Sequence, residues 1–153
     1  MSAPVFPSGP LLASIAEAKP WKIPDPCPRK PRTGESVQVK ICTVYRLARA
    51  YALTANEALA VVGLIDHESA GTWSPTVRGD GGCSIGIAQW NSCVGRRAPA
   101  SFEAQARLII TEMRDKFAAN PLNHAICLHN SPAGRCNRDY VAKVLAAKAQ
   151  FEL

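Results

Sequence analysis

Apolar residues recur at helical spacing through most of the chain beyond its first 35 residues. This spacing of three and four residues predicts four amphipathic helices. In the second of them, Thr54 and Glu57 match a capping box, which fixes where that helix begins. The predicted ranges are 36–51, 54–70, 102 to a stop near 120, and a last helix from about 137.

A different pattern lies between the second and third predicted helices. Residues 76–92 are rich in Gly and Ser and carry β-branched Thr76, Val77, Ile85 and Ile87, which predicts a small irregular β hairpin. The expected fold class is therefore α+β and mainly helical. A short segment through Ile126 and Leu128, without a predicted helix, leads to a loop around residue 130.

Prolines divide the chain into two parts. Residues 1–33 hold eight of the twelve prolines and predict an extended or loosely ordered N-terminal arm. Residues 34–153 are long and apolar enough for one domain with its own core. A short apolar stretch in the arm, residues 11–18, is too short to cross a membrane, so no transmembrane segment is expected.

Glu68 is the strongest candidate for chemistry. It comes seven residues after Val61 and three after Ile65, which places all three on one helical face. A carboxyl group therefore continues an apolar stripe. Partial burial of a carboxylate raises its pKa, and a carboxylic acid protonated near neutral pH can act as a general acid. The alternative is an ordinary, partly exposed carboxylate at a helix end.

The residues that flank Glu68 resemble the signature of the lysozyme-like lytic transglycosylases and goose-type lysozymes. The resemblance covers roughly residues 36–151 and departs from the family pattern at Ala88, His129 and Pro132. It implies a lysozyme-like catalytic domain with a small β hairpin beside the active-site cleft. The matching elements, in chain order, are Glu68-Ser69, the glycine-rich turn 79–84, Gly86-Ile87-Ala88-Gln89, His129-Asn130 and Tyr140-Val141.

The activity implied by this resemblance is cleavage of the β-1,4 bond between N-acetylmuramic acid and N-acetylglucosamine in peptidoglycan, with no cofactor. Glu68 would be the acid, and Asp80 would be the second carboxylate unless it serves only the turn. With a second carboxylate the product is hydrolytic; without one, attack by the substrate's own 6-hydroxyl gives a 1,6-anhydro end. By the same resemblance, Ser69, Gln89, Asn130 and Tyr140 would contact the sugar or the acid.

Aromatic residues add one further candidate contact. Trp73 and Trp90 can stack on sugar faces, although we expect one of them to be buried packing. Trp90, next to Gln89, is the one expected in the substrate site.

Charge favours an anionic partner, although charge dispersed along the chain also serves solubility alone. The chain has 18 basic and 12 acidic residues, a net charge of +6. No zinc finger, basic helix or aromatic–basic strand pattern points to nucleic acid. A cationic membrane-active protein would need a basic amphipathic helix, which the sequence lacks. A noncatalytic glycan-binding module with the same fold remains the main alternative to an enzyme, and we expect a monomer.

Six cysteines are many for a chain of this size. Their spacing contains no C-x-x-C, so no metal site is expected, and their even number allows fifteen disulfide arrangements. Three local pairs are plausible, and they indicate an extracytoplasmic protein: periplasmic, secreted or part of a phage particle. Buried free thiols in a cytosolic protein are the alternative. The three local pairs are Cys27–Cys42, Cys83–Cys93 and Cys127–Cys136.

Overall fold

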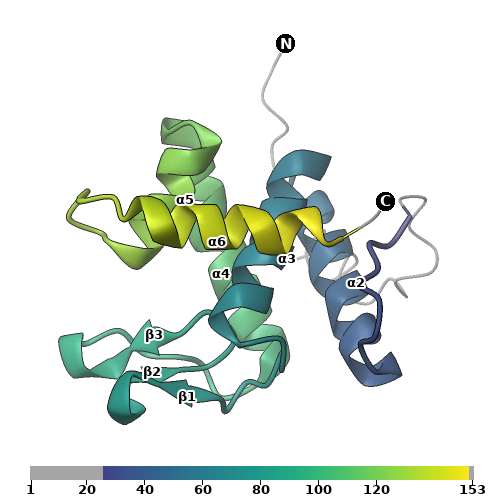
Figure 1. Ribbon diagram of the computed structural model, residues 1–153, viewed down its shortest axis with the longest axis horizontal. Helices are drawn as coiled ribbons and strands as arrows, with labels where there is room; N and C mark the ends of the chain where they lie inside the picture. Colours follow the sequence, from purple (N-terminus) through teal and green to yellow (C-terminus); the bar gives the residue numbers. More distant parts are fainter. Residues whose placement is uncertain (1–25, 152–153) are drawn as a thin grey trace, which may run out of the picture.

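The computed structural model describes residues 26–151 of the chain, and most of the predicted N-terminal arm, residues 1–25, lies outside them. The described part contains five α-helices and one three-stranded antiparallel sheet, so an α+β class that is mainly helical is confirmed (Figure 1). The helices are α2 (Glu35–Ala50), α3 (Ala55–Glu68), α4 (Phe102–Ala119), α5 (Leu122–Asn130) and α6 (Arg138–Ala149).

Helix α3 is the central element. The predicted capping box is present, because the Thr54 hydroxyl accepts from the Glu57 amide while the Glu57 carboxylate accepts from the Thr54 amide. The helix ends at Glu68, two residues before the predicted end, because Ala70 and Gly71 take positive φ angles of 52° and 76°. Its residues from Ala60 to Asp66 are all buried.

Helix α6 crosses α3 at very short range (Figure 1). Gly63 of α3 faces the backbone of Lys148 in α6, and a Cβ atom at residue 63 would lie 2.7 Å from the Lys148 amide nitrogen and Cα atom. Glycine is therefore required where the two helices meet. The contact fixes the position of α6 relative to the end of α3.

The sheet lies on one side of the helices, directly after α3 in the chain (Figure 1). The sequence predicted a hairpin over residues 76–92, and the structure adds a third strand within that range. A tight turn makes this possible: the Gln89 amide group donates to the carbonyls of Gly86 and Val77, at 2.9 and 3.2 Å. The two-residue strands are β1 (Arg78–Gly79), β2 (Ser84–Ile85) and β3 (Trp90–Asn91), paired in the order β1-β2-β3.

Helix α5 corrects the sequence interpretation. The segment through Ile126 was expected to be a connection, and it is helical from Leu122 to Asn130. Pro121 stands just before the first helical residue, where the missing amide hydrogen costs nothing. Ala125, Ile126 and His129 are buried, which is the spacing of one helical face. The predicted helix starts at Phe102 and near Asn137 are confirmed. The Ser101 and Asn137 side chains accept from amides in the first turns of these helices.

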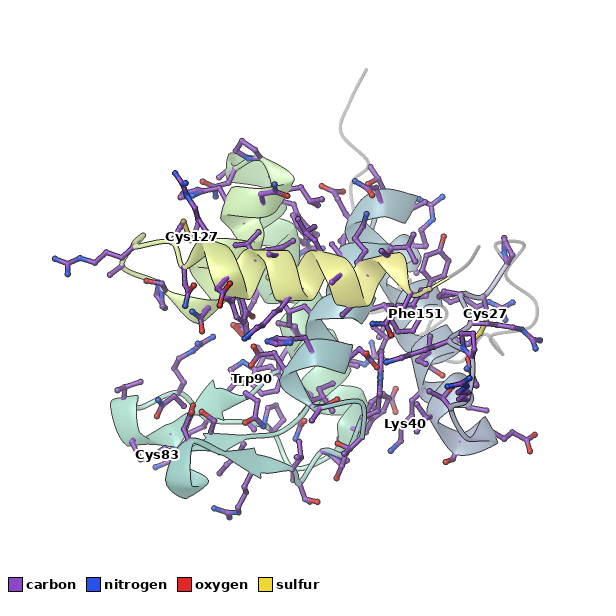
Figure 2. The ribbon with its side chains drawn as sticks, in the orientation of Figure 1. Cys27, Lys40, Cys83, Trp90, Cys127 and Phe151 are labelled. Carbon is purple, nitrogen blue, oxygen red and sulfur yellow. A yellow bond between two sulfur atoms is a disulfide. The ribbon has the colours of Figure 1, made fainter. Side chains whose placement is uncertain are left out.

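Three disulfides connect residues that are close in sequence: Cys27–Cys42, Cys83–Cys93 and Cys127–Cys136. These are the three local pairs that the cysteine spacing suggested. Figure 2 places one cysteine of each pair, at three separated sites of the molecule. Disulfides of this kind are compatible with an extracytoplasmic location. Among residues 26–151, no helix has both the length and the apolar character needed to cross a membrane.

Residues 26–33, at the end of the predicted arm, lie against the helical domain. Lys30 reaches the buried side chain of Asp66 in α3, with its Nζ 2.6 Å from Oδ2. The other carboxylate oxygen, Oδ1, accepts from the indole N–H of Trp73 at 3.0 Å. Asp66 thus serves the structure, in agreement with its position on the opposite side of α3 from the candidate acid.

Candidate active site

Glu68 is the last residue of α3 and lies where this helix leads into the sheet. Its side chain is partly buried, and burial is the main reason that its pKa rises from 4.5 to about 7. The negative charge of Asp80 raises this pKa further, whereas the Tyr140 hydroxyl and the positive charge of Arg96 lower it. At neutral pH, Glu68 therefore has a large protonated fraction, as a general acid requires.

Tyr140 comes from the first turn of α6 and is 7% exposed. Its hydroxyl faces the Glu68 carboxyl, but it has no partner at normal hydrogen-bond geometry among the described residues, so this contact is weak. Burial and the nearby Glu68 charge both raise the pKa of the phenol. The His67 ring meets the Tyr140 ring edge-on, with 5.5 Å between their centroids. A neutral hydroxyl therefore lies beside Glu68, and the role that the resemblance implies for Tyr140 stays a prediction.

Asp80 lies in the turn between β1 and β2, with its side chain exposed. Its φ angle is 50°, a region that Asp tolerates better than most residues. The carboxylate accepts a 2.6 Å hydrogen bond from the hydroxyl of the buried Ser84. Because the Asp80 charge acts on the pKa of Glu68, the two carboxyl groups are electrostatically coupled. The two readings of Asp80, turn residue and second carboxylate, are compatible in this geometry.

Two of the expected sugar-contacting residues instead hold the backbone. Ser69 is fully buried, and its hydroxyl accepts from the Trp73 amide at 3.0 Å. The Gln89 amide group donates to the Gly86 and Val77 carbonyls, which lie just outside the strands, and Gln89 has a φ of 53°. Both residues shape the segment that follows Glu68. Their direct contact with a sugar was inferred from resemblance, and their present partners are protein atoms.

The expectation that Trp90 stacks on a sugar is wrong for this conformation. Trp90 is 2% exposed and lies between the sheet and the helices (Figure 2). Its indole N–H donates to Glu112 of α4 at 2.7 Å. Trp73 is also fully buried, so both tryptophans pack in the core rather than one of them. Asn130, predicted to lie in a loop, is the exposed last residue of α5.

A polar cluster beside the site escaped the sequence analysis. His129 is 3% exposed, and its Nε2 lies 2.8 Å from the Ala88 carbonyl, to which the neutral ring donates. Burial lowers the pKa of His129 to about 3, so the ring is uncharged. Arg96 donates to the His129 carbonyl and to the Glu112 carboxylate, both at 3.4 Å. The resemblance included Ala88 and His129, but no motif or spacing in the sequence connects Arg96 and Glu112 to them.

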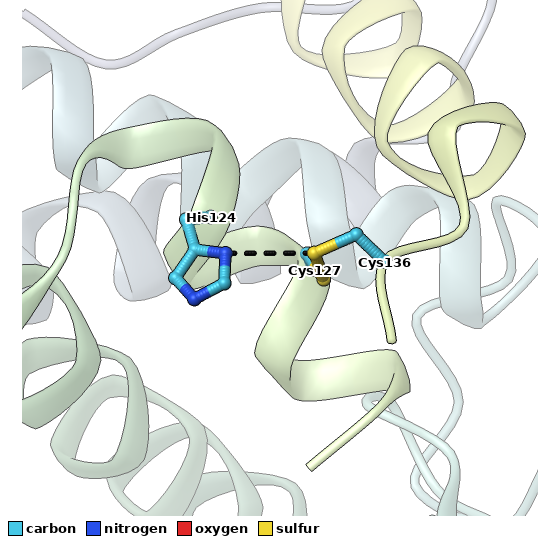
Figure 3. Close-up of side chains that lie close together, drawn as sticks. All are labelled: His124, Cys127 and Cys136. Carbon is cyan, nitrogen blue, oxygen red and sulfur yellow. Dashed lines mark hydrogen bonds between the residues drawn. A yellow bond between two sulfur atoms is a disulfide. The ribbon is translucent and has the colours of Figure 1, made fainter. Parts of the chain in front are cut away.

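The described residues also bring together three side chains of metal-binding type: His124, Cys127 and Cys136 (Figure 3). The His124 Nδ1 atom lies 3.5 Å from the Cys136 sulfur. Cys127 and Cys136 are joined in a disulfide, however, and a metal site needs thiolates. This cluster therefore holds the start of α6 to α5 and is not a metal site in the oxidised protein.

Comparisons with known proteins add no relative. No protein-family model matches the chain, and no curated protein or solved structure matches it significantly.

Proposed function

We propose that this protein is a glycosidase that cleaves the β-1,4 bond between N-acetylmuramic acid and N-acetylglucosamine in peptidoglycan. The observation that carries the proposal is Glu68, a partly buried acid with a pKa of about 7, beside a glycine-rich turn that bears a second carboxylate. Both groups stand within sequence elements that resemble lytic transglycosylases and goose-type lysozymes. The net charge of +6 suits an anionic wall polymer.

In this mechanism, protonated Glu68 donates its proton to the glycosidic oxygen while the bond from that oxygen to the sugar's C1 breaks. The positive charge that develops at C1 is stabilised by the Asp80 carboxylate. Water, or the 6-hydroxyl of the same sugar, then bonds to C1 and gives its proton to the Glu68 carboxylate. The neutral Tyr140 hydroxyl stands beside the Glu68 carboxyl during both proton transfers.

The first test measures how fast the turbidity of purified peptidoglycan sacculi falls, across the pH range. Because Glu68 must be protonated, we expect activity to fall as the pH rises through about 7. Mass spectrometry of the released fragments then separates hydrolytic from anhydro products, which differ by one water. Binding to sacculi without release of fragments would favour a glycan-binding module, and leakage from wall-free liposomes would indicate a membrane-active protein instead.

Replacing Asp80 by Asn tests the second carboxylate. We expect slower hydrolysis, a larger anhydro share, and a basic limb of the pH–rate profile at lower pH, since the Asp80 charge raises the pKa of Glu68. Asn tolerates the positive φ of this turn, so the fold is kept. Asp115→Asn, an exposed change on α4, is the matched control. An unchanged rate, product ratio and pH profile would leave Asp80 as a turn residue alone.

A further inference from the structure

Arg96 links the two parts of the molecule beside the candidate acid. Its backbone amide donates to the Asn91 carbonyl at the end of β3, at 3.0 Å. Its guanidinium group donates to the His129 carbonyl at the end of α5 and to the Glu112 carboxylate of α4. The side chain is therefore anchored at both ends, between the sheet and the helices.

The guanidinium keeps much of its binding capacity. Its two hydrogen bonds are both 3.4 Å long, and a guanidinium has five N–H donors, so most of them have no partner among the described residues. The side chain is 27% exposed. Glu112 neutralises Arg96 only in part, because one of the Glu112 carboxylate oxygens already accepts from Trp90 at 2.7 Å. Arg96 can therefore bind an external anion while it keeps its hydrogen bonds to the protein.

The contacts with β3, α4 and α5 fix the position of this cation, and its charge acts on the groups of the candidate site. Arg96 lowers the pKa of Glu68 and that of Tyr140, so its charge acts on the acid and on the hydroxyl beside it. His129, which it also contacts, is neutral and adds no competing charge. A glycan bound at Glu68 would therefore lie in the field of a partly exposed guanidinium that has free N–H donors.

We propose that Arg96 is a specificity residue that binds a carboxylate on the O3 substituent of the muramyl sugar, and so favours wall glycan over neutral chitin. This inference rests on the proposed glycosidase function. The carboxylate can be the free lactyl group of a peptide-free strand or a carboxylate of the stem peptide that is attached there. Both present two oxygens to the planar fork of a guanidinium.

The test compares wild type, Arg96→Gln and Arg96→Lys on three substrates. These are intact sacculus fragments, peptide-free strands, and the same peptide-free strands after conversion of their carboxylates to amides. We expect Arg96→Gln to raise KM about tenfold on a carboxylate-bearing substrate and to leave the amidated strands nearly unchanged. Arg96→Lys keeps the charge but lacks the planar fork, so its KM should lie between those of wild type and Arg96→Gln. A loss confined to intact fragments identifies the stem peptide as the source of the carboxylate.

Arg97→Gln, at the exposed neighbouring position, is the matched control and should change KM less than twofold. Arg96→Gln should also move the basic limb of the pH–rate profile to higher pH, because its charge lowers the pKa of Glu68. An equal loss on charged and amidated strands would show that Arg96 only supports the fold and would overturn the inference. Wild type inert on every glycan would instead remove the glycosidase function itself.

Discussion

Glu68→Gln is expected to abolish glycan cleavage, by at least about 100-fold, while the fold is retained. The amide has the same shape as the carboxyl group but cannot give a proton to a glycosidic oxygen. Glu68 is only partly buried, so its replacement leaves the packing of α3 intact. The measurement is the rate of fragment release from sacculi by the purified variant, with helical circular dichroism as the check on folding.

The same substitution should stabilise the protein at alkaline pH. The pKa of Glu68 is about 7 when folded against an ordinary 4.5, so the folded state binds this proton more tightly. Stability is then highest below about pH 4.5 and is lost as the pH rises through about 7. At pH 8 the buried charge costs about 3 kcal/mol, and Gln removes that cost. At pH 4 the two proteins should unfold at nearly the same temperature.

Glu35→Gln is the matched control, since Glu35 is exposed in the first turn of α2. It should keep both the lytic rate and the pH dependence of unfolding. Retention by Glu68→Gln of more than about a tenth of the wild-type rate would remove Glu68 as the acid. Loss of activity without the pH-dependent gain in stability would mean that the carboxyl group is less buried than the structure indicates.

Gly63→Ala is expected to destabilise the protein by about 2 kcal/mol. Alanine is the better helix former by about 1 kcal/mol, so a propensity argument alone predicts the opposite sign. The new methyl group would lie 2.7 Å from two backbone atoms of Lys148, and a backbone cannot rotate away as a side chain can. Thermal unfolding should show a midpoint lower by roughly 6–10 °C.

Because α6 carries Tyr140, Gly63→Ala should also reduce glycan cleavage through a shift of the hydroxyl beside Glu68. Gly34→Ala serves as the control: it adds the same methyl group where no other atom lies within 4 Å and φ is −67°. That change should cost less than about 1 kcal/mol. Equal or higher stability of Gly63→Ala would show that the two helices can separate without penalty.

Local sequence signals were sufficient for most helices and for the partial burial of Glu68. Thr54 and Glu57 mark the start of α3 by chemistry within one turn, and Glu68 continues its apolar stripe. Helix α5 was missed because its polar residues, among them His129, suggested a loop. Burial of that imidazole is possible only because the distant Ala88 carbonyl accepts its N–H. Such a partnership forms in three dimensions and leaves no periodic trace in the sequence.

The candidate site also combines features that the sequence predicts with features that only the fold brings together. The pKa of Glu68 follows from burial, which the stripe predicted, and from Asp80, Arg96 and Tyr140, which only the fold brings near. Trp90 looked like a stacking residue because an aromatic beside a motif is a common sugar contact. Its burial follows from Glu112, which satisfies the indole N–H inside the core.

The spacing of the three disulfides has a consequence for how the acid is assembled. Each bond closes a ring of neighbouring residues, with separations of only 15, 10 and 9. A fully oxidised but unfolded chain is therefore an open string with three small rings, and no covalent bond brings Glu68 near Tyr140. The entropic cost of bringing Glu68 and Tyr140 together must therefore be offset entirely by the packing of α3 against α6. The rings can form early, but Glu68 acquires its raised pKa only when the core closes around it.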